Sequence, residues 1–196
     1  AIPAMPVGGS FRCIDFALSN MSNSHVQTVA VLTQYNARSL NEHLSSSKWW
    51  DFGRKQGGMF LFTPTVTAEN SDWYRGTADA MYQNIDFLKR RHEPYVIISS
   101  GDCVYKMDYN KVLDYHIAKK ADITVVCKDM PADANINRFG VVRMNEDSRI
   151  VEFEEKPIIA QSNTISTGVY VIRRRQLIEI LEKSAEENRF DFVADV

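Results

Sequence analysis

The sequence predicts an α/β fold in which helices cover a mostly parallel sheet. The first observation is that strand-like and helix-like segments alternate along most of the 196 residues. Parallel sheets with crossover helices require this order. The second observation is the apolar run Tyr95-Val96-Ile97-Ile98, followed by two serines and Gly101-Asp102. A run without polar alternation predicts a central strand buried on both faces.

The residues before this strand show three helix patterns and two strand patterns. From Ile14, apolar residues recur at positions i, i+3, i+4 and i+7, which predicts an amphipathic helix. Asn36 is a candidate cap for a second helix over 37–44. The remaining patterns predict two short strands and one long helix that leads into the central strand, over 28–32, 59–62 and 78–88.

The alternation continues after the central strand. Asp108 is a candidate cap for a helix over 109–117. His116 occupies an apolar slot of that helix, so we expect a buried, hydrogen-bonded histidine and not a ligand. The later patterns predict a strand, a hairpin, a further strand and a final helix, over 123–127, 139–144 with 149–156, 168–172 and 177–181.

Composition limits the class of protein. A chain of 196 residues with 44% hydrophobic content predicts one sizeable domain over 1–196. A net charge of -2 gives no electrostatic reason to expect nucleic acid or an acidic membrane surface as a partner. We interpret the basic runs 89–91 and 173–175 as solvated faces.

Cysteine usage and hydropathy predict a cytoplasmic protein. Cys13, Cys103 and Cys127 are far apart and form no CxxC pair, which indicates neither a disulfide framework nor a zinc site. No apolar run approaches the roughly 20 residues that cross a bilayer. We therefore expect a reducing compartment and no membrane partner.

The chemistry of Gly101-Asp102 has two readings. Ligands of open α/β sheets gather at the carboxyl ends of strands, where a carboxylate can hold Mg²⁺ against phosphate oxygens. Gly-Asp is also ordinary turn chemistry, and the two residues alone do not decide between these readings. The chain has no G-x-G-x-x-G after a strand, no P-loop, no H-E-x-x-H and no G-x-S-x-G.

Seven stretches resemble the bacterial and plant ADP-glucose pyrophosphorylases, and they occur in the family's order. They cover nearly the whole chain, and their number in register makes the resemblance specific. They are 3–9 (PAMPVGG), 11–20 (FRCIDFALSN), 32–35 (LTQY), 73–80 (WYRGTADA), 101–109 (GD with YKMDY), 153–157 (FEEKP) and 168–171 (GVYV).

The resemblance implies a Rossmann-like nucleotidyltransferase domain, with a β-helix domain expected further along the protein. It implies the conversion of ATP and glucose 1-phosphate to ADP-glucose and pyrophosphate, with Mg²⁺ as cofactor. In this family a Gly-rich loop cradles the triphosphate, and that loop would lie before Ala1. A transfer of this kind depends on positioning and on charge neutralisation.

The resemblance also implies roles for eight residues. Asp102 and Asp191 would ligate Mg²⁺, and Lys156 would hold the phosphate of glucose 1-phosphate as a point charge beside Glu155. The backbone at Gly76 would approach the adenine. The substrate loops would be lined by Ser166, Tyr74 and Gln34.

Each role has a structural alternative. Glu155-Lys156 could be an exposed strand pair, worth roughly 0.2–1 kcal/mol. Tyr74 and Trp73 could be core aromatics beside the long helix. Arg12 and Asp15 could form a structural pair near a helix start.

Three positions depart from the catalytic members of the family. Ile2 and Ser10 stand where those members carry lysines, and Cys103 stands where they usually carry histidine. These changes resemble the GlgD branch, a companion subunit found beside the catalytic subunit in Gram-positive bacteria.

Two hypotheses follow from these departures. The first is a regulatory subunit with weak or no activity alone, which would join a catalytic homologue in a hetero-oligomer, expected as a tetramer. The second is a fully active ADP-glucose pyrophosphorylase, which the retained Asp102 and Lys156 keep open. A nucleotidyltransferase for another sugar or base is a third option, disfavoured by the match over 11–20 and 73–80.

Overall fold

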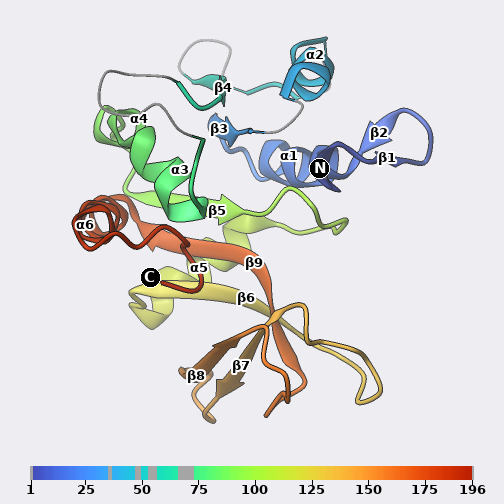
Figure 1. Cartoon of the computed structure of the whole chain (residues 1–196), viewed down its shortest axis with the longest axis vertical. Coiled ribbons are helices and arrows are strands. Elements are labelled where there is room, and N and C mark those ends of the chain that lie inside the picture. The colour runs from blue at the N-terminus through green and yellow to red at the C-terminus, as the bar shows by residue number, and fades with distance from the viewer. Residues whose placement is uncertain (1, 35–36, 47–49, 53–56, 66–72, 196) are drawn as a thin grey trace.

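The computed structural model describes residues 2–34, 37–46, 50–52, 57–65 and 73–195 (Figure 1). The predicted cap at Asn36 lies outside the described residues. The first half of the chain contains short helical and strand elements in alternation. They are η1 (Ile2–Ala4), β1 (Pro6–Val7), β2 (Phe11–Arg12), α1 (Cys13–Asn23), β3 (Thr28–Leu32), α2 (Ala37–Ser46), β4 (Gly58–Phe62), α3 (Thr77–Gln83) and α4 (Ile85–Lys89).

The second half begins with the strand predicted from the apolar run and confirms most of the later patterns. Asp108 caps its helix as predicted, because its carboxylate accepts the backbone N–H of Asn110. The elements are β5 (Tyr95–Ser99), α5 (Tyr109–Lys119), β6 (Ile123–Asp129), β7 (Gly140–Met144), β8 (Ile150–Glu155), β9 (Thr164–Arg173) and α6 (Arg174–Glu186).

The α/β class with mixed sheets is confirmed, but parallel pairing does not dominate among the described strands. β3 and β4 pair in parallel, whereas β9 runs antiparallel to β5, β6 and β7. The physical reason is the connection: the β7–β8 hairpin, with no helix, lies between β6 and β9. The chain therefore reverses direction and returns beside β6 without a crossover helix.

Helices cover both faces of the sheet around β9. On one face, α3, α4 and α6 pack on apolar residues of β5 and β9, with Ala78, Ile172, Leu177 and Leu181 in that core. On the other face, the His116 ring of α5 stands edge-on to Tyr95 at 5.5 Å between ring centroids. The prediction of a buried, hydrogen-bonded histidine is confirmed, since His116 is 1% exposed and its Nδ1 lies 2.7 Å from the Thr124 hydroxyl.

The strand β5 differs in one respect from its prediction. We expected burial on both faces, but all five of its residues are partly exposed. Among the described strands, β5 pairs with β9 alone. The pairing runs from Tyr95, opposite Arg173, to Ser99, opposite Val169. Burial of this strand is therefore less complete than an apolar run predicts.

The single long helix predicted over 78–88 is wrong, because the chain forms two helices that meet at Asn84. The Asn84 backbone (φ -112°, ψ 22°) leaves the helical region. Its side-chain amide donates to the Ala80 carbonyl at 2.9 Å and to the Tyr74 hydroxyl at 3.0 Å. Asparagine side chains compete with the backbone for such partners, and this competition explains the break.

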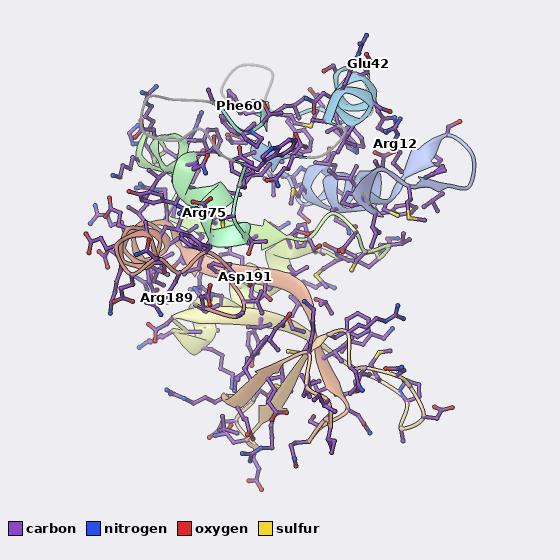
Figure 2. All side chains as sticks on the ribbon, in the orientation of Figure 1. Arg12, Glu42, Phe60, Arg75, Arg189 and Asp191 are labelled. Atoms are coloured by element: carbon purple, nitrogen blue, oxygen red, sulfur yellow. The ribbon has the colours of Figure 1, made fainter. Side chains whose placement is uncertain are left out.

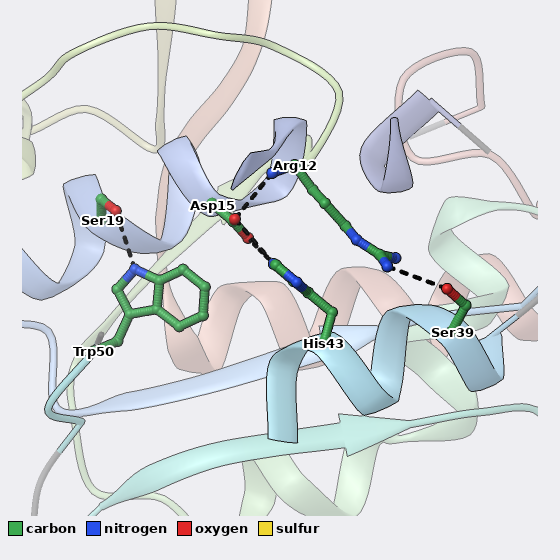
Figure 3. A network of polar contacts seen from close by, with 6 residues as sticks. All are labelled: Arg12, Asp15, Ser19, Ser39, His43 and Trp50. Atoms are coloured by element: carbon green, nitrogen blue, oxygen red, sulfur yellow. Dashed lines mark hydrogen bonds and ion pairs between the residues drawn. The ribbon is translucent and has the colours of Figure 1, made fainter. Parts of the chain in front are cut away.

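A polar network joins α1 to α2 and to Trp50 (Figure 3). The Asp15 carboxylate accepts the Arg12 backbone N–H at 2.9 Å and lies 2.9 Å from His43 Nε2. The Arg12 guanidinium donates to the Ser39 hydroxyl at 3.1 Å. Asp15 is 5% exposed, and its buried carboxylate is stabilised by the N-terminal end of α1 and by His43 of α2. This arrangement agrees with the structural alternative for Arg12 and Asp15.

Candidate functional site

Asp102 lies in the turn that follows β5, with its side chain exposed. One carboxylate oxygen, Oδ1, accepts a hydrogen bond from the Ser100 hydroxyl and lies 3.6 Å from Cys103 Sγ. The Ser100 N–H donates to the Gly168 carbonyl at 3.0 Å, which ties the turn to β9. In the described part of the chain Oδ2 has no hydrogen-bond partner. Asp102 is therefore oriented by one oxygen and offers the other to a cation.

The segment after Asp102 is fastened to α1. Asn20, which is 4% exposed, donates through its amide to the Tyr105 carbonyl at 3.0 Å and accepts the Met107 N–H at 3.1 Å. The Ser24 hydroxyl accepts the Tyr109 N–H at 2.9 Å. One helix thus supplies both ends of a clamp on the loop that carries Asp102.

Three hydroxyl groups hold the same loop from the sheet side. The Tyr105 hydroxyl lies 2.8 Å from Ser99 Oγ and 2.6 Å from the Tyr109 hydroxyl. Burial raises the pKa of Tyr109, so its hydroxyl stays protonated at neutral pH. The cluster is neutral, and it positions the loop without adding charge near Asp102.

Lys156 follows β8 and carries the positive φ of 47° that is uncommon outside glycine. Its ammonium lies 2.8 Å from Glu155 Oε1, with the two side chains 63% and 27% exposed. The hydrogen bond that the Lys156 ammonium donates to Glu155 raises the pKa of Lys156, and the charges of Glu155 and Asp191 add to that rise. The lysine is therefore a permanent cation close to both carboxylates.

Tyr170 contacts one of the predicted residues, Ser166, although the sequence analysis assigned it no role. Its hydroxyl is 3.2 Å from Ser166 Oγ, and Ser166 is itself 7% exposed. Burial raises the pKa of Tyr170, and the charges of Glu155 and Asp191 contribute to the rise. Residues 166 and 170 are an even number apart on one strand, and this spacing is the signal that could have found Tyr170.

Asp191 begins a turn after α6. Its Oδ1 accepts the backbone N–H groups of Val193 and Ala194, both at 2.9 Å. The Phe190 carbonyl beside it accepts the Ala78 and Asp79 N–H groups at the start of α3. The Arg75 guanidinium lies 3.8 Å from the centre of the Phe190 ring, and Figure 2 shows Arg75 and Asp191 on the segments that meet there.

The remaining predicted residues lie in three different environments. They are Gly76, Tyr74 and Gln34. A Cβ atom at Gly76 would lie 2.3 Å from the Phe190 carbonyl oxygen, so the close backbone approach seen here is to Phe190. The Tyr74 hydroxyl accepts a hydrogen bond from the Asn84 side-chain amide, and burial raises the pKa of Tyr74. Gln34 follows β3 and is half-buried.

The structure connects several of the predicted residues. Lys156 forms an ion pair with Glu155, and the charge of Asp191 contributes to the raised pKa of Lys156 and of Tyr170. Asp102 joins them through Ser100 and the Gly168 turn, whose N–H donates to Ser166 Oγ at 3.3 Å. Gly76 is next to this group because it packs on Phe190. Gln34 follows β3, which pairs with β4 in a separate two-stranded sheet, so it lies apart from this group.

Asp102 and Asp191 are the two residues expected to ligate Mg²⁺, and the chemistry of their carboxylates can be compared with that expectation. Among the described residues no cluster of three or more His, Cys, Asp or Glu side chains could hold a metal ion. Asp102 and Asp191 each have one carboxylate oxygen that makes no hydrogen bond within the described ranges. Mg²⁺ is usually bound by one or two carboxylates together with substrate phosphates and water. These two residues have that chemistry.

The class of protein is shown by comparison with a family model. The chain belongs to the nucleotidyl transferase family, whose model matches residues 1–195. No helix in the part of the chain that the structure describes is long and apolar enough to cross a membrane.

Curated relatives narrow the likeness further. The chain is 46% identical over 198 residues to a glucose-1-phosphate adenylyltransferase of Bacillus cytotoxicus, covering 100% of this chain and 52% of the relative. It is 46% identical over 191 residues to that of Clostridium perfringens, covering 97% and 48% respectively. The relative from Bacillus anthracis is 44% identical over 198 residues, covering 100% and 52%. The chain thus spans about half the length of these relatives.

Replacing Asn20 by alanine should loosen the Asp102 loop. The change leaves the Tyr105 carbonyl and the Met107 N–H without their partner, and each buried unsatisfied group costs about 1–3 kcal/mol. We expect unfolding in urea to show a loss of about 2 kcal/mol or more, with faster hydrogen exchange at Met107. Asn23→Ala, an exposed position on the same helix, is the control and should change neither. Equal exchange in both variants would contradict the clamp.

Replacing Gly76 by alanine should push the C-terminal segment away from α3. The new methyl group cannot coexist with the Phe190 carbonyl at 2.3 Å, and forced overpacking costs roughly 1–3 kcal/mol. Limited proteolysis should cut between α6 and residue 195 sooner than in the wild type. Ser10→Ala, on an exposed turn, serves as the control. An unchanged cleavage rate with unchanged stability would show that the segment relaxes freely.

Proposed function

We propose that the chain is the nucleotidyltransferase part of a glucose-1-phosphate adenylyltransferase subunit, acting in glycogen biosynthesis. The observation that carries the proposal is the Lys156–Glu155 ion pair after β8, together with the hydrogen bonds that tie the Asp102 turn to Gly168 and Ser166 of β9. The names of the relatives support the choice of ATP and glucose 1-phosphate as substrates.

In the proposed reaction, a phosphate oxygen of glucose 1-phosphate attacks the α-phosphorus of ATP. A new P–O bond forms as the bond to the pyrophosphate leaving group breaks, giving ADP-glucose and pyrophosphate. Such a transfer requires no covalent protein nucleophile, because positioning and charge stabilisation account for most of the rate. The residues of this chain therefore act by holding the two anions in line.

Lys156 is the proposed contact for the sugar phosphate, since its ammonium is exposed enough to meet a ligand and is always charged. Glu155 orients that ammonium and has a second oxygen for a sugar hydroxyl. Asp102 and Asp191 would hold Mg²⁺, which when bound neutralises charge on the departing pyrophosphate. The turns around Gln34, Tyr74, Gly76 and Ser166 would line the substrates.

We further propose that the subunit is of the regulatory GlgD type, with weak or no activity alone. Three side chains stand at positions where the resemblance to catalytic members leads us to expect basic residues. Ile2 is 55% exposed and Ser10 lies on an exposed turn. Burial and the neighbouring Asp102 raise the pKa of Cys103, so its thiol stays neutral. Such a subunit would work with a catalytic homologue in a hetero-oligomer, expected as a tetramer.

A fully active enzyme is the second candidate. It is favoured by the retained Asp102 and Lys156 and by the names of relatives that are 44–46% identical. The two candidates share the site described above and differ only in the rate that the chain supports without a partner.

The metal assignment is tested with Asp102→Asn in the complete natural protein. The change removes a charge without changing volume, so the Mg²⁺-dependent gain in ATP affinity should fall about tenfold or more. Calorimetry with and without Mg²⁺ measures that gain. Asp147→Asn, on the exposed β7–β8 turn, is the matched control. A wild type whose ATP binding depends on Mg²⁺, with an identical dependence in Asp102→Asn, would remove Asp102 from the metal site.

The regulatory type is tested by turnover. The complete protein alone should form ADP-glucose far more slowly than its catalytic relatives, because each lost electrostatic contact costs on the order of 10²–10³ in rate. Mixed with the catalytic homologue of the same organism, it should form a hetero-oligomer and change that partner's activity. Ile2→Lys with Ser10→Lys should raise the rate, and Ile2→Gln with Ser10→Gln should not.

Ile2 and Ser10 are both exposed, so the lysine and glutamine substitutions at these positions leave the packing intact. Turnover by the unmodified protein comparable to that of a dedicated pyrophosphorylase, with no association with the homologue, would overturn the regulatory type. The fully active enzyme would then stand.

A further inference from the structure

Thr77, the first residue of α3, is bonded to a segment 115 positions further along the chain. Its hydroxyl accepts the Phe192 backbone N–H at 2.8 Å. The Thr77 side chain is exposed, so changes to it leave the packed core in place. The hydroxyl thus connects the loop before α3 to the segment that carries Asp191, although the sequence analysis assigned Thr77 no role.

Two further bonds from the same turn of α3 hold this segment. The Ala78 and Asp79 backbone N–H groups donate to the Phe190 carbonyl at 2.8 and 3.1 Å. The backbone is therefore held on both sides of Asp191, at Phe190 and at Phe192. Beyond that point, the Asp191 carboxylate accepts two backbone N–H groups of its own turn through Oδ1. The first turn of α3 thus determines where the backbone of Asp191 lies.

The ring of Phe192 connects this segment to β9. Phe192 is 7% exposed, and its ring meets that of Tyr170 edge-on, with the ring centroids 5.6 Å apart. The Tyr170 hydroxyl lies 3.2 Å from Oγ of Ser166, the residue expected to line a substrate loop. A displacement of the Phe192 backbone would therefore change the surroundings of Asp191 and also those of the Ser166–Tyr170 pair.

The loop before α3 packs against the same segment. A Cβ atom at Gly76 would lie 2.3 Å from the Phe190 carbonyl oxygen, and the Arg75 guanidinium lies 3.8 Å from the centre of the Phe190 ring. Residues 73–76, which include the expected nucleotide contact Gly76, therefore share one contact surface with residues 190–192. Thr77 lies where these two segments meet.

We propose that Thr77 is a positioning residue of the candidate site, because its hydrogen bond to Phe192 keeps Asp191 in the place that ligand binding requires. The inference rests on the proposed function, in which Asp191 contacts a ligand. Binding groups have to be held within about 0.5 Å of the productive geometry by the residues behind them. Valine has nearly the shape of threonine and lacks the hydroxyl acceptor, so this role can be separated from packing.

The test uses the complete protein and calorimetry with two ligands, glucose 1-phosphate and ATP, the latter with and without Mg²⁺. Asp191→Asn first shows which quantity Asp191 supports, the affinity for the sugar phosphate or the Mg²⁺-dependent gain in ATP affinity. Thr77→Val should lower that same quantity about three- to tenfold and leave the other within about twofold. Thr77→Ser restores the acceptor and should bind as the wild type does. Hydrogen exchange at the Phe192 amide should be faster in Thr77→Val than in Thr77→Ser.

The control is Thr65→Val, which removes an exposed hydroxyl that donates only to the nearby Thr63 carbonyl, and it should change neither quantity. Faster exchange at Phe192 with both quantities unchanged in Thr77→Val would show that the hydroxyl supports the fold alone, and would overturn the positioning role. A loss in Thr77→Val that Thr77→Ser shares would overturn it as well.

Failure of the proposed function gives a different result. If the wild type binds both ligands and Asp191→Asn changes neither quantity, Asp191 holds no ligand, and the role of Thr77 is overturned together with that assignment. A wild type that binds neither ligand would overturn the proposed function itself, and with it the role of Thr77.

Discussion

The antiparallel pairing of β9 is the interaction on which the rest of the structure depends. This ten-residue strand pairs with β5, β6 and β7, so it joins the helix-covered sheet to the β7–β8 hairpin. Its residue Gly168 accepts a hydrogen bond from Ser100 in the Asp102 turn, and Ser166 is hydrogen-bonded to both Gly168 and Tyr170. A shift of this strand by one residue would move all of these side chains to the opposite face.

The register of β9 is protected by local features. Gly168 has a φ of +73°, and a Cβ atom there would lie 3.2 Å from Ser100 Cβ. The pairing with β6 is interrupted between Val125 and Cys127. Bulges of this kind bend a strand and re-aim its side chains, and they occur near functional sites. The bend lets one strand contact the Asp102 turn through Gly168 and also carry the hydrogen-bonded pair Ser166 and Tyr170.

The proposed site carries more negative than positive charge on its own residues. Asp102, Glu155 and Asp191 are carboxylates, whereas Lys156 is a cation whose pKa is raised by two of them. The proposed nucleotide and sugar-phosphate ligands would add further negative charge, so binding to this group alone would meet net repulsion. Mg²⁺ on Asp102 and Asp191 would change that balance, and cations from other parts of the protein would do the same.

The parts of the fold that local patterns encode could be predicted from the sequence. The cap at Asp108 and the buried His116 follow from short-range spacing, and the structure confirms both. The break at Asn84 was missed because apolar periodicity continues through it, while the side-chain bonds that cause it depend on Tyr74.

Long-range features could not be predicted in the same way. The antiparallel partner of β5 comes more than 60 residues later, and the apolar run, which is typical of parallel sheets, predicted the wrong direction for it. Gly76 is required by the Phe190 carbonyl, which no spacing in the sequence places beside it. Tyr170 stayed hidden because a single tyrosine in an apolar strand looks like core.

Ile2 and Ser10 are the positions at which the proposed loss of lysine would affect catalysis and leave the stability of the fold unchanged. Ile2 lies on η1 with 55% of its surface exposed, and Ser10 lies on the exposed turn between β1 and β2. Neither side chain belongs to the packed clusters around α1 or β9. Surface substitutions away from packing and buried hydrogen bonds usually change stability by less than about 0.5 kcal/mol. A lysine could therefore be absent there without cost to the fold, whereas its absence would remove charge that the proposed transfer step uses. Under the proposed regulatory type, the subunit would keep the architecture of the family and lose activity for this reason.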